Sequence, residues 1–178
     1  MKYLVASDIH GSSYYAKKLL EKIKNESIDK IILLGDIYYH GPRNPLPYEY
    51  NPKLVSELLN QISDKIIAVK GNCDSEVDQM VSDFKIENHF EKEIFGKKFF
   101  FTHGHIYNKD SLPLNDFDFL VYGHFHTGFI LEKDNKIFVN PGSTTLPKEK
   151  TENSYLVIDE KEKTLKIKNF DDKILYQM

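Results

Sequence analysis

The first part of the chain alternates short apolar runs with segments whose apolar positions recur at helical spacing. Residues 2–6, 30–34 and 65–69 (KYLVA, KIILL and KIIAV) have the length and composition of buried strands. Between them, apolar side chains follow a helical period, first at Ala16, Leu19, Leu20 and Ile23, then at Leu54, Val55, Leu58, Leu59 and Ile62. Ser12 or Ser13 can cap the first helix. This order predicts parallel βαβ units.

From Glu93 onward the pattern changes to short strand-like runs separated by turns. We expect strands at residues 98–102, 119–122, 128–131, 136–139, 154–158 and 164–168. Asp134-Asn135 and residues 159–163 have the composition of tight turns. The two halves together predict an α/β (α+β) fold with two mixed sheets and helices on the outside, formed as a single domain by residues 1–178.

Composition narrows the class of protein. Hydrophobic residues make up 40% and charged residues 29% of the 178 residues, as in a soluble globular domain with a sizeable core. The net charge of −3 gives no overall attraction to nucleic acid or anionic membrane, although a local basic patch stays open. One cysteine excludes an intramolecular disulfide. Because the chain has neither a signal sequence nor the roughly 20 apolar residues of a membrane helix, we expect a cytoplasmic protein.

Side chains that bind metals follow five of the expected strands, at the point where each strand ends. They are Asp8, His10, Asp36, Asn72, His103, His105, His124 and His126. Ligands of open α/β sheets bind beyond the carboxyl ends of strands, so we expect these side chains to converge. In an extended segment, residues i and i+2 point to the same side, so Asp8 with His10, and His124 with His126, are each expected to form a paired arm. Glycines stand beside these residues, where the backbone must turn sharply or approach an ion, at Gly35, Gly71, Gly104 and Gly123.

The types of ligand restrict the metal. Imidazole, carboxylate and amide oxygen suit Mn²⁺, Fe²⁺, Zn²⁺, Ni²⁺ or Co²⁺ better than Ca²⁺. Seven such ligands are too many for one tetrahedral zinc, and they suit two ions joined by one bridging carboxylate. Two ions about 3.5–4 Å apart can clamp an in-line displacement at phosphorus, with a hydroxide between them as the nucleophile. Mn²⁺ is our first expectation, and Zn²⁺, Fe²⁺, Ni²⁺, Co²⁺ and Mg²⁺ are the alternatives.

These residues occur in motifs that, in this order, resemble those of the calcineurin-like metallophosphoesterase superfamily. The motifs are Asp8-x-His10, Gly35-Asp36, Gly71-Asn72, His103 and Gly123-His124-x-His126. The resemblance is closer to its small bacterial and archaeal phosphodiesterase branch, which includes the YfcE-type proteins, through SDIHG, HGPRN, KGNCDSEVDQM, FTHGH, VYGHFH and NPGS. It covers roughly residues 2–147, and five motifs in order are far more specific than any one of them.

The resemblance implies a four-layer αββα sandwich and a division of the ligands. Asp8, His10 and His126 would hold the first ion, and Asp36 would bridge the two. The second ion would be held by Asn72, His103 and His124. His105 is an alternative to His103 as ligand, or orients the ligands from behind. The implied activity is hydrolysis of a small phosphodiester, and relatives of this kind are often homodimers or homotetramers, although no stretch identifies an interface.

One position departs from much of the superfamily. A histidine assigned to leaving-group protonation or transition-state stabilisation often follows the motif asparagine, and here that position is Cys73. A thiol is a weak hydrogen-bond donor without positive charge. General acid catalysis typically contributes about 10²–10⁴-fold, so its absence favours activated diesters over alkyl monoesters. We therefore expect the catalytic residues to be Asp36, Asn72 and Cys73, together with Arg43.

Arg43 belongs to a proline-rich loop, residues 41–47, that excludes a helix or central strand. The loop is either a lip over the site, with Arg43 on a phosphate oxygen and His40 beside it, or an ordinary rigid surface loop. Nearby tyrosines can stack on a nucleobase or simply pack the loop: Tyr38, Tyr39, Tyr48 and Tyr50. Residues 140–143 (NPGS) support the site from behind or form a turn.

Two other classes of function compete with the phosphodiesterase. One is a protein-binding scaffold, because a retromer subunit that resembles this fold has lost ligand positions, whereas all seven are filled here. The other is a nuclease, but the pI of about 6.2 and the lack of a basic stripe disfavour long nucleic acid substrates.

Overall fold

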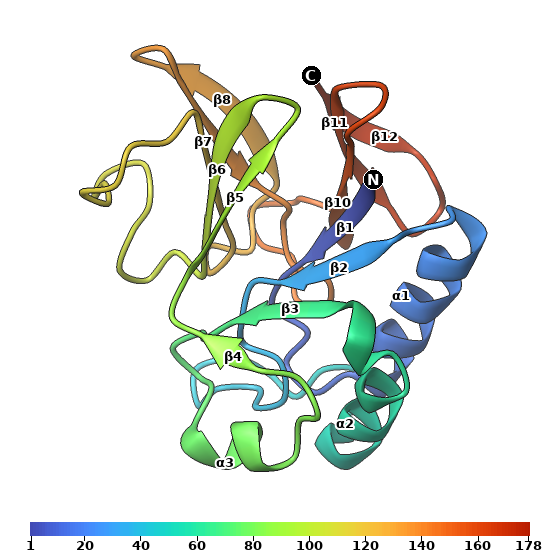
Figure 1. Cartoon of the computed structure of the whole chain (residues 1–178). Coiled ribbons are helices and arrows are strands. Elements are labelled where there is room, and N and C mark those ends of the chain that lie inside the picture. The colour runs from blue at the N-terminus through green and yellow to red at the C-terminus, as the bar shows by residue number, and fades with distance from the viewer.

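Two β-sheets pack face to face, and α-helices cover the outer side of one of them (Figure 1). The computed structural model describes residues 1–178. One apolar cluster fills the space between the sheets, and it includes Val5, Ile32, Phe99 and Val121. A second lies between the larger sheet and the helices and includes Leu4, Leu33, Leu19 and Leu59. The alternation of inward and outward side chains along each strand divides the two clusters.

The larger sheet has seven strands in the order β12-β11-β10-β1-β2-β3-β4. Their bounds are β1 Lys2–Ala6, β2 Lys30–Leu33, β3 Ile66–Val69, β4 Ile86–Glu87, β10 Ser154–Asp159, β11 Thr164–Asn169 and β12 Ile174–Gln177. The pairs β1–β2, β2–β3 and β3–β4 are parallel, and β10 joins β1 in the antiparallel sense. The prediction of parallel βαβ units in the first half of the chain is therefore confirmed.

The smaller sheet has five strands in the order β5-β6-β7-β9-β8. Their bounds are β5 Phe90–Ile94, β6 Lys97–Thr102, β7 Phe119–Tyr122, β8 Phe129–Lys133 and β9 Lys136–Asn140. Strands β6, β7 and β9 are parallel, and the outer pairs are antiparallel. Asp134 and Asn135 both adopt positive φ, 54° and 58°, as a two-residue hairpin turn of the primed type requires. The expected hairpin is thus present.

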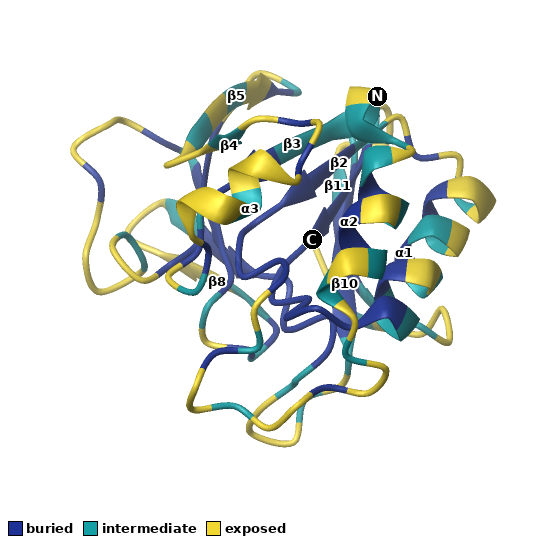
Figure 2. Cartoon of the chain, turned by 90° about the horizontal axis from the view of Figure 1, so that it is seen from below, coloured by how far each residue is buried: buried dark blue, intermediate teal, exposed yellow.

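Helix α1, Ser13–Asn25, and helix α2, Pro52–Asn60, turn their buried faces to the larger sheet (Figure 2). Ser12 caps α1 by accepting the Tyr15 N–H, which settles the two candidate caps. A 3₁₀ turn, Ser63–Lys65, precedes β3, and a short helix α3, Glu76–Met80, precedes β4. None of these helices has the length and apolar character that crossing a membrane requires.

The structure differs from the sequence prediction at the periphery. Three layers of the implied αββα sandwich are present, but no helix covers the outer face of the smaller sheet. A third apolar cluster there packs Phe100, Leu120 and Phe138 against Phe117 and Tyr107 of a loop. Five elements were not expected from the pattern: the 3₁₀ turn before β3, α3, β4, β5 and β12. β4 has two residues, too few to show a period, and β5 has three consecutive charged residues between two apolar ones, so no alternation marks it as a strand.

Candidate functional site

The metal-binding side chains predicted from the sequence meet where β1, β2, β3, β6 and β7 end. Backbone hydrogen bonds tie these ends together, from Asp8 N–H to Gly35 O (3.2 Å) and from His10 N–H to Asp36 O (2.9 Å) within the larger sheet. The bond from His124 N–H to Asp8 Oδ2 (3.0 Å) joins the two sheets. Parallel strands deliver their carboxyl ends to one edge, so the predicted convergence is confirmed.

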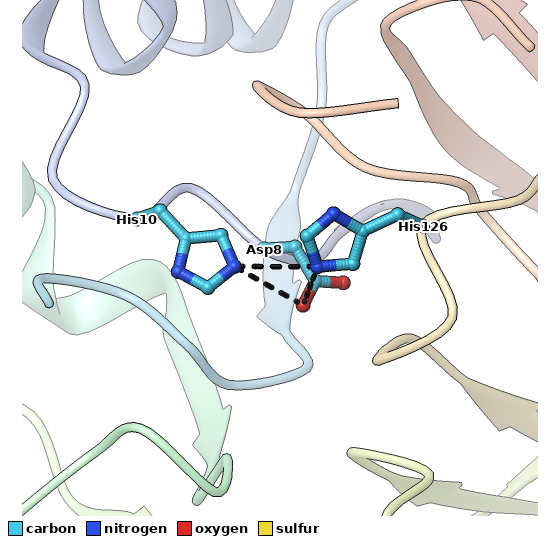
Figure 3. A group of neighbouring side chains, drawn as sticks. All are labelled: Asp8, His10 and His126. Carbon is cyan, nitrogen blue, oxygen red and sulfur yellow. Dashed lines mark hydrogen bonds and ion pairs between the residues drawn. The ribbon is translucent and has the colours of Figure 1, made fainter. Parts of the chain in front are cut away.

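The first group consists of Asp8, His10 and His126, which point toward one another (Figure 3). The Nε2 atoms of His10 and His126 lie 3.3 Å apart. Asp8 Oδ1 lies 3.7 Å from His10 Nε2 and 3.3 Å from His126 Nε2. All three residues are buried.

The second group consists of Asn72, His103 and His124. His103 Nε2 lies 3.0 Å from Asn72 Oδ1 and 3.3 Å from His124 Nδ1. Asp36 stands between the groups, because its Oδ2 lies 3.4 Å from His103 Nε2 and 3.8 Å from His10 Nε2. The other oxygen of Asp36 accepts the Cys73 N–H at 2.8 Å.

The nitrogen and oxygen atoms that face one another in this arrangement are suitable ligands for divalent cations. The Nδ1 atoms of three histidines face backbone carbonyls at 2.6–2.8 Å, pairing His10 with Tyr39, His103 with Leu34 and His126 with Leu146. When Nδ1 donates, each Nε2 offers only a lone pair, so the two Nε2 atoms at 3.3 Å have no proton to share. Asp8 Oδ1 is buried without a hydrogen-bond partner. Ligands at about 2.0–2.2 Å from a shared ion lie about 3.0–3.5 Å from one another, close to the spacings here.

Five of these residues adopt left-handed backbone conformations. The φ angles are 57° for Asp8, 49° for His10, 53° for Asp36, 66° for His124 and 61° for His126. Such φ values are found in only a few per cent of non-glycine residues, and strained backbone concentrates at functional sites. The prediction that Asp8–His10 and His124–His126 are extended segments is wrong, since each member turns through the left-handed region.

The side chains of His124 and His126 also face different groups. His126 Nε2 faces Asp8 and His10, whereas His124 presents Nδ1 to His103. The pair therefore does not form one arm but serves both groups. Asp8 and His10 do converge as expected.

Two glycines allow the backbones to approach this closely. A Cβ at Gly71 would lie 2.1 Å from Asp36 Oδ1, and a Cβ at Gly123 would lie 1.8 Å from Ser7 Oγ. Both distances are far below van der Waals contact, so these positions exclude every other residue unless the ligand strands move apart. The glycines expected beside the ligands thus have a steric reason.

Charges in the site shift several pKa values. Burial lowers the pKa of His103, but its hydrogen bond to Asp36 and the charge of Asp8 outweigh burial and raise it to about 9. Burial and the positive charge of His103 lower the pKa of His124 to about 4. Burial would raise the pKa of Asp8, but the adjacent imidazoles of His126 and His103 hold it well below its usual range. Both aspartates thus stay ionised at neutral pH, as metal ligands must be.

Asp74 is a part of the site that the sequence analysis missed. Its buried carboxylate accepts three backbone N–H groups at 2.8 Å, from Asp36, Ile37 and Gly71. It therefore holds the loop after β2, with Asp36, against the loop after β3, with Asn72. Burial raises the pKa of Asp74 to about 6, although the N–H donors favour its ionised form. Only its place directly after the Asn72-Cys73 motif hinted at this role.

Asp74→Asn is expected to weaken metal binding about 10–100-fold, the usual loss when a residue that orients ligands is replaced. The amide nitrogen cannot accept a hydrogen bond, so at least one of the three N–H groups loses its partner. Calorimetric titration of the metal-free protein measures the change. Asp29→Asn is the matched control, since Asp29 accepts the Lys2 N–H (2.7 Å) away from the site. Equal metal affinities in both variants would contradict the positioning role.

Asp8, Ile9 and Gly123 are supported from behind by the last residue of β9 and the segment that follows it. Ser143 Oγ donates to Asp8 O at 3.0 Å, and Thr145 Oγ1 donates to Ile9 O at 2.9 Å. Asn140 Nδ2 donates to Gly123 O at 2.8 Å. Of the two interpretations of residues 140–143, support of the site therefore holds.

A cavity of about 700 Å³ opens beside both groups. Its lining includes Asp36, Tyr39, Arg43, Asn72, Cys73, His124, Phe125, His126 and Lys148. Arg43 is exposed at this cavity, as the interpretation of its loop as a lip requires, whereas His40 lies behind, its ring 5.2 Å from that of Tyr50. His105 is exposed, with its ring 5.4 Å from that of His103, and is not part of the lining.

The tyrosines near the cavity take different positions. Tyr39 lines it and is 42% exposed, so it alone is free to contact a bound group there. Tyr38 is buried and bonds Ser82, Tyr48 packs against Tyr14, and Tyr50 packs against His40. Packing is thus the role of three of the four.

Cys73 lies at the cavity wall beside Asp36. Burial, and then the negative charge of Asp36, raise the pKa of the Cys73 thiol to about 12. The thiol therefore stays protonated, which does not suit a nucleophile. Its sulfur nevertheless lies within 4.8 Å of the potential metal-ligand atoms of His10 and Asp36.

Comparisons with known proteins agree with this geometry. Residues 1–163 match the model of the calcineurin-like phosphoesterase superfamily domain. Phosphodiesterase YfcE of Escherichia coli strain K12 is 43% identical over 161 residues, which cover 89% of this chain and 88% of that protein.

Solved structures give the same picture. The structure of YfcE, a phosphoesterase from E. coli, superposes with a TM-score of 0.95 at 38% identity and covers 100% of this chain and 98% of its own. The structure of Vacuolar Protein Sorting 29 from Cryptosporidium parvum has a TM-score of 0.66 at 20% identity, covering 99% and 96% of the two chains. The latter likeness concerns the fold alone.

Proposed function

Because this chain belongs to the calcineurin-like phosphoesterase superfamily, we propose that it is a metal-dependent phosphodiesterase that hydrolyses small phosphodiesters. The observation that carries the proposal is the buried cluster of imidazole nitrogens and carboxylates at the strand ends, open to a cavity of about 700 Å³. The Nε2 atoms of His10 and His126 face each other at 3.3 Å beside the unpartnered Oδ1 of Asp8, and burial of such polar atoms is costly unless a cation lies among them.

The ligand division follows the two groups. Asp8, His10 and His126 would hold one ion, and Asn72, His103 and His124 the other. Asp36 would contact both, in keeping with its distances of 3.8 and 3.4 Å to His10 and His103. When bound, two divalent ions acidify the attacking water and neutralise charge on the phosphoryl oxygens. We propose Mn²⁺ as the first candidate ion, since N/O ligand sets of this kind accept it.

Side chains that line the cavity would position the substrate and determine which leaving groups can depart. Asn72 and His124 are both ligands and cavity walls, so the phosphate is placed against the metal ligands from the cavity side. Arg43 supplies hydrogen-bond donors to phosphate oxygens of the substrate from the wall of the cavity. Cys73 Sγ has no readily transferable proton, so the leaving group must depart without help from this position. Esters of acidic alcohols and phenols meet that condition.

The assay is hydrolysis of bis(p-nitrophenyl) phosphate by the metal-free protein after addition of Mn²⁺, Zn²⁺, Ni²⁺, Co²⁺ or Mg²⁺. Turnover with at least one ion supports the proposal. No turnover with any of them would leave the fold as a protein-binding scaffold. We also propose that the enzyme acts in the cytoplasm. We further propose that it is a homodimer or homotetramer, and sedimentation of the purified protein tests this oligomeric state.

Cys73→His is expected to raise the activity toward p-nitrophenyl phosphate relative to bis(p-nitrophenyl) phosphate by about tenfold or more. The imidazolium would supply a proton and a positive charge where the thiol has neither, and general acids typically contribute about 10²–10⁴-fold. The ratio of the two kcat/KM values is the measurement. Cys73→Ser is the control, because a hydroxyl adds no charge. An unchanged ratio in Cys73→His would mean that the missing acid does not set selectivity.

A further inference from the structure

The cavity is larger than a simple diester needs. Its volume of about 700 Å³ falls within the range of sites that enclose drug-sized ligands, and a phosphate with two small ester groups leaves much of it empty. Two cations, Arg43 and Lys148, line it, and Asp36 is the one carboxylate in the lining. Asp36 is already committed to the histidines of the cluster. Arg43 and Lys148 therefore give this cavity positive charge beside the metal-binding cluster.

Neither cation is neutralised by the protein. Arg43 and Lys148 take part in no ion pair and no side-chain hydrogen bond of the structure, whereas lysines such as Lys22 and Lys168 are paired with carboxylates. The net charge of the chain is −3, so these cations do not belong to a general basic surface. Unpaired cations in a concave site attract anions more strongly than cations on an open surface.

The backbone that carries Lys148 is fastened to the site. Its N–H donates to His126 O at 3.0 Å, and its carbonyl accepts Thr151 Oγ1 at 2.7 Å. Thr151 Oγ1 also lies 3.3 Å from His126 O. The turn forces Glu149 and Lys150 into left-handed conformations, with φ of 52° and 63°. Two consecutive strained residues show that this turn is specified by its surroundings and not by local preference.

The backbone of Arg43 is fixed in a similar way within the loop that follows β2. Asn44 Nδ2 donates to His40 O at 2.8 Å and Asn44 N–H donates to Gly41 O at 3.3 Å. Pro42 and Pro45 restrict the same turn. Arg43 thus lies in a restrained loop after β2, and Lys148 lies in a restrained loop after β9. Both residues line the same cavity.

We propose that Arg43 and Lys148 form a subsite for a second phosphate, so that the preferred substrates are small diesters carrying a further phosphate monoester. Guanidinium binds phosphate through two parallel hydrogen bonds, and ammonium adds a point charge. The exposed rings of Tyr39 and Phe125, at 42% and 43%, offer apolar surface in the same cavity to the organic part of such a substrate. This inference rests on the proposed phosphodiesterase activity.

The test compares two esters that differ only by the second phosphate: thymidine 5′-(p-nitrophenyl phosphate) and the same ester with a 3′-phosphate. For the Mn²⁺-loaded protein, kcat/KM should be roughly tenfold higher for the 3′-phosphorylated ester, as charge-assisted hydrogen bonds give. The preference should shrink as salt is raised from 0.05 to 0.5 M, since salt screens exposed charges. Equal values for the two esters would overturn the subsite.

Variants assign the preference to residues. Lys148→Gln should lower the ratio of the two kcat/KM values about threefold or more, and the Arg43→Gln/Lys148→Gln pair should bring it close to one. Lys150→Gln is the matched control, because Lys150 is exposed in the same turn but does not line the cavity. A ratio that is unchanged in the double variant, or that falls equally in Lys150→Gln, would contradict the assignment.

A binding measurement separates this inference from the catalytic proposal. Calorimetry with the metal-free protein should show tighter binding of thymidine 3′,5′-bisphosphate than of thymidine 5′-monophosphate, and Lys148→Gln should reduce the difference. If neither ester is hydrolysed with any metal, the catalytic proposal fails, whereas this binding difference stands or falls by itself. If both esters are hydrolysed equally and both nucleotides bind equally, only the subsite is wrong.

Discussion

Asp36→Asn is expected to lower kcat/KM for bis(p-nitrophenyl) phosphate by at least about 100-fold, because even residues that only orient metal ligands contribute about 10–100-fold. Asp36 Oδ2 faces His103 Nε2 at 3.4 Å and His10 Nε2 at 3.8 Å. The amide removes the charge that the two groups share. It keeps an oxygen that can accept the Cys73 N–H, so the fold should persist. Metal analysis by mass spectrometry should find fewer ions per chain.

Asp64→Asn makes the same change of charge at an exposed position of the 3₁₀ turn before β3 and serves as the control. It should retain wild-type activity and metal content. Circular dichroism confirms that both variants are folded. Activity near wild type in Asp36→Asn, with unchanged metal content, would mean that the two-metal site is wrong.

Removal of metal by a chelator is expected to abolish hydrolysis and to leave the protein folded but less stable. A ligand that binds only the folded state stabilises it by about 2.7 kcal/mol at a concentration 100 times its Kd. For a chain of this size that corresponds to a rise in Tm of about 5–10 °C when Mn²⁺ is returned. Differential scanning calorimetry measures the shift, and Ca²⁺ is the control ion because it disfavours imidazole ligands. Full activity in the chelated protein would overturn the proposal.

The affinity of the metal-free protein for metal ions, measured by calorimetric titration, should depend on pH. With a pKa of about 9, His103 carries a proton at pH 7 in the metal-free protein, and an ion must displace that proton to reach Nε2. The affinity for the ion at this position should therefore rise by about tenfold per unit as pH increases from 7 toward 9, and level off above it. Calorimetry in buffers of different ionisation enthalpy counts the released protons. An affinity that stays constant between pH 7 and 9 would contradict the protonated state.

The cavity connects these results to specificity. In the proposed mechanism the candidate metal ligands act at phosphorus, whereas Arg43, Lys148, Tyr39 and Phe125 line the cavity where the rest of the substrate would bind. Loss of a ligand should therefore affect all substrates alike. Loss of the Lys148 cation should affect those with a second phosphate most. Substrate comparisons across the Asp36 and Lys148 variants separate the two effects.

Much of this protein was determined by its sequence. The periods of apolar residues fixed the parallel half and the strand-rich half, because burial of one helix face or of a whole strand leaves a regular pattern. The types of ligand and their places after strands indicated one site, because parallel strands deliver their ends to one edge. The ligand set itself stays a prediction, while the convergence of its members is observed.

Other features were decided only by tertiary structure. The left-handed backbone at Asp8 and His124 lies where a hydrogen bond from His124 N–H to Asp8 Oδ2 joins the two sheets. Asp and His tolerate this region better than most residues, but that tolerance does not tell which of them adopt it. The choice of Nδ1 in His124, the three N–H groups that Asp74 accepts and the approach of Lys148 to His126 each join segments far apart in the chain. A sequence pattern records which face of an element is buried, but it does not record which distant loop that face meets. For that reason the candidate metal-binding side chains were visible in the sequence, and the groups that hold and surround them were not.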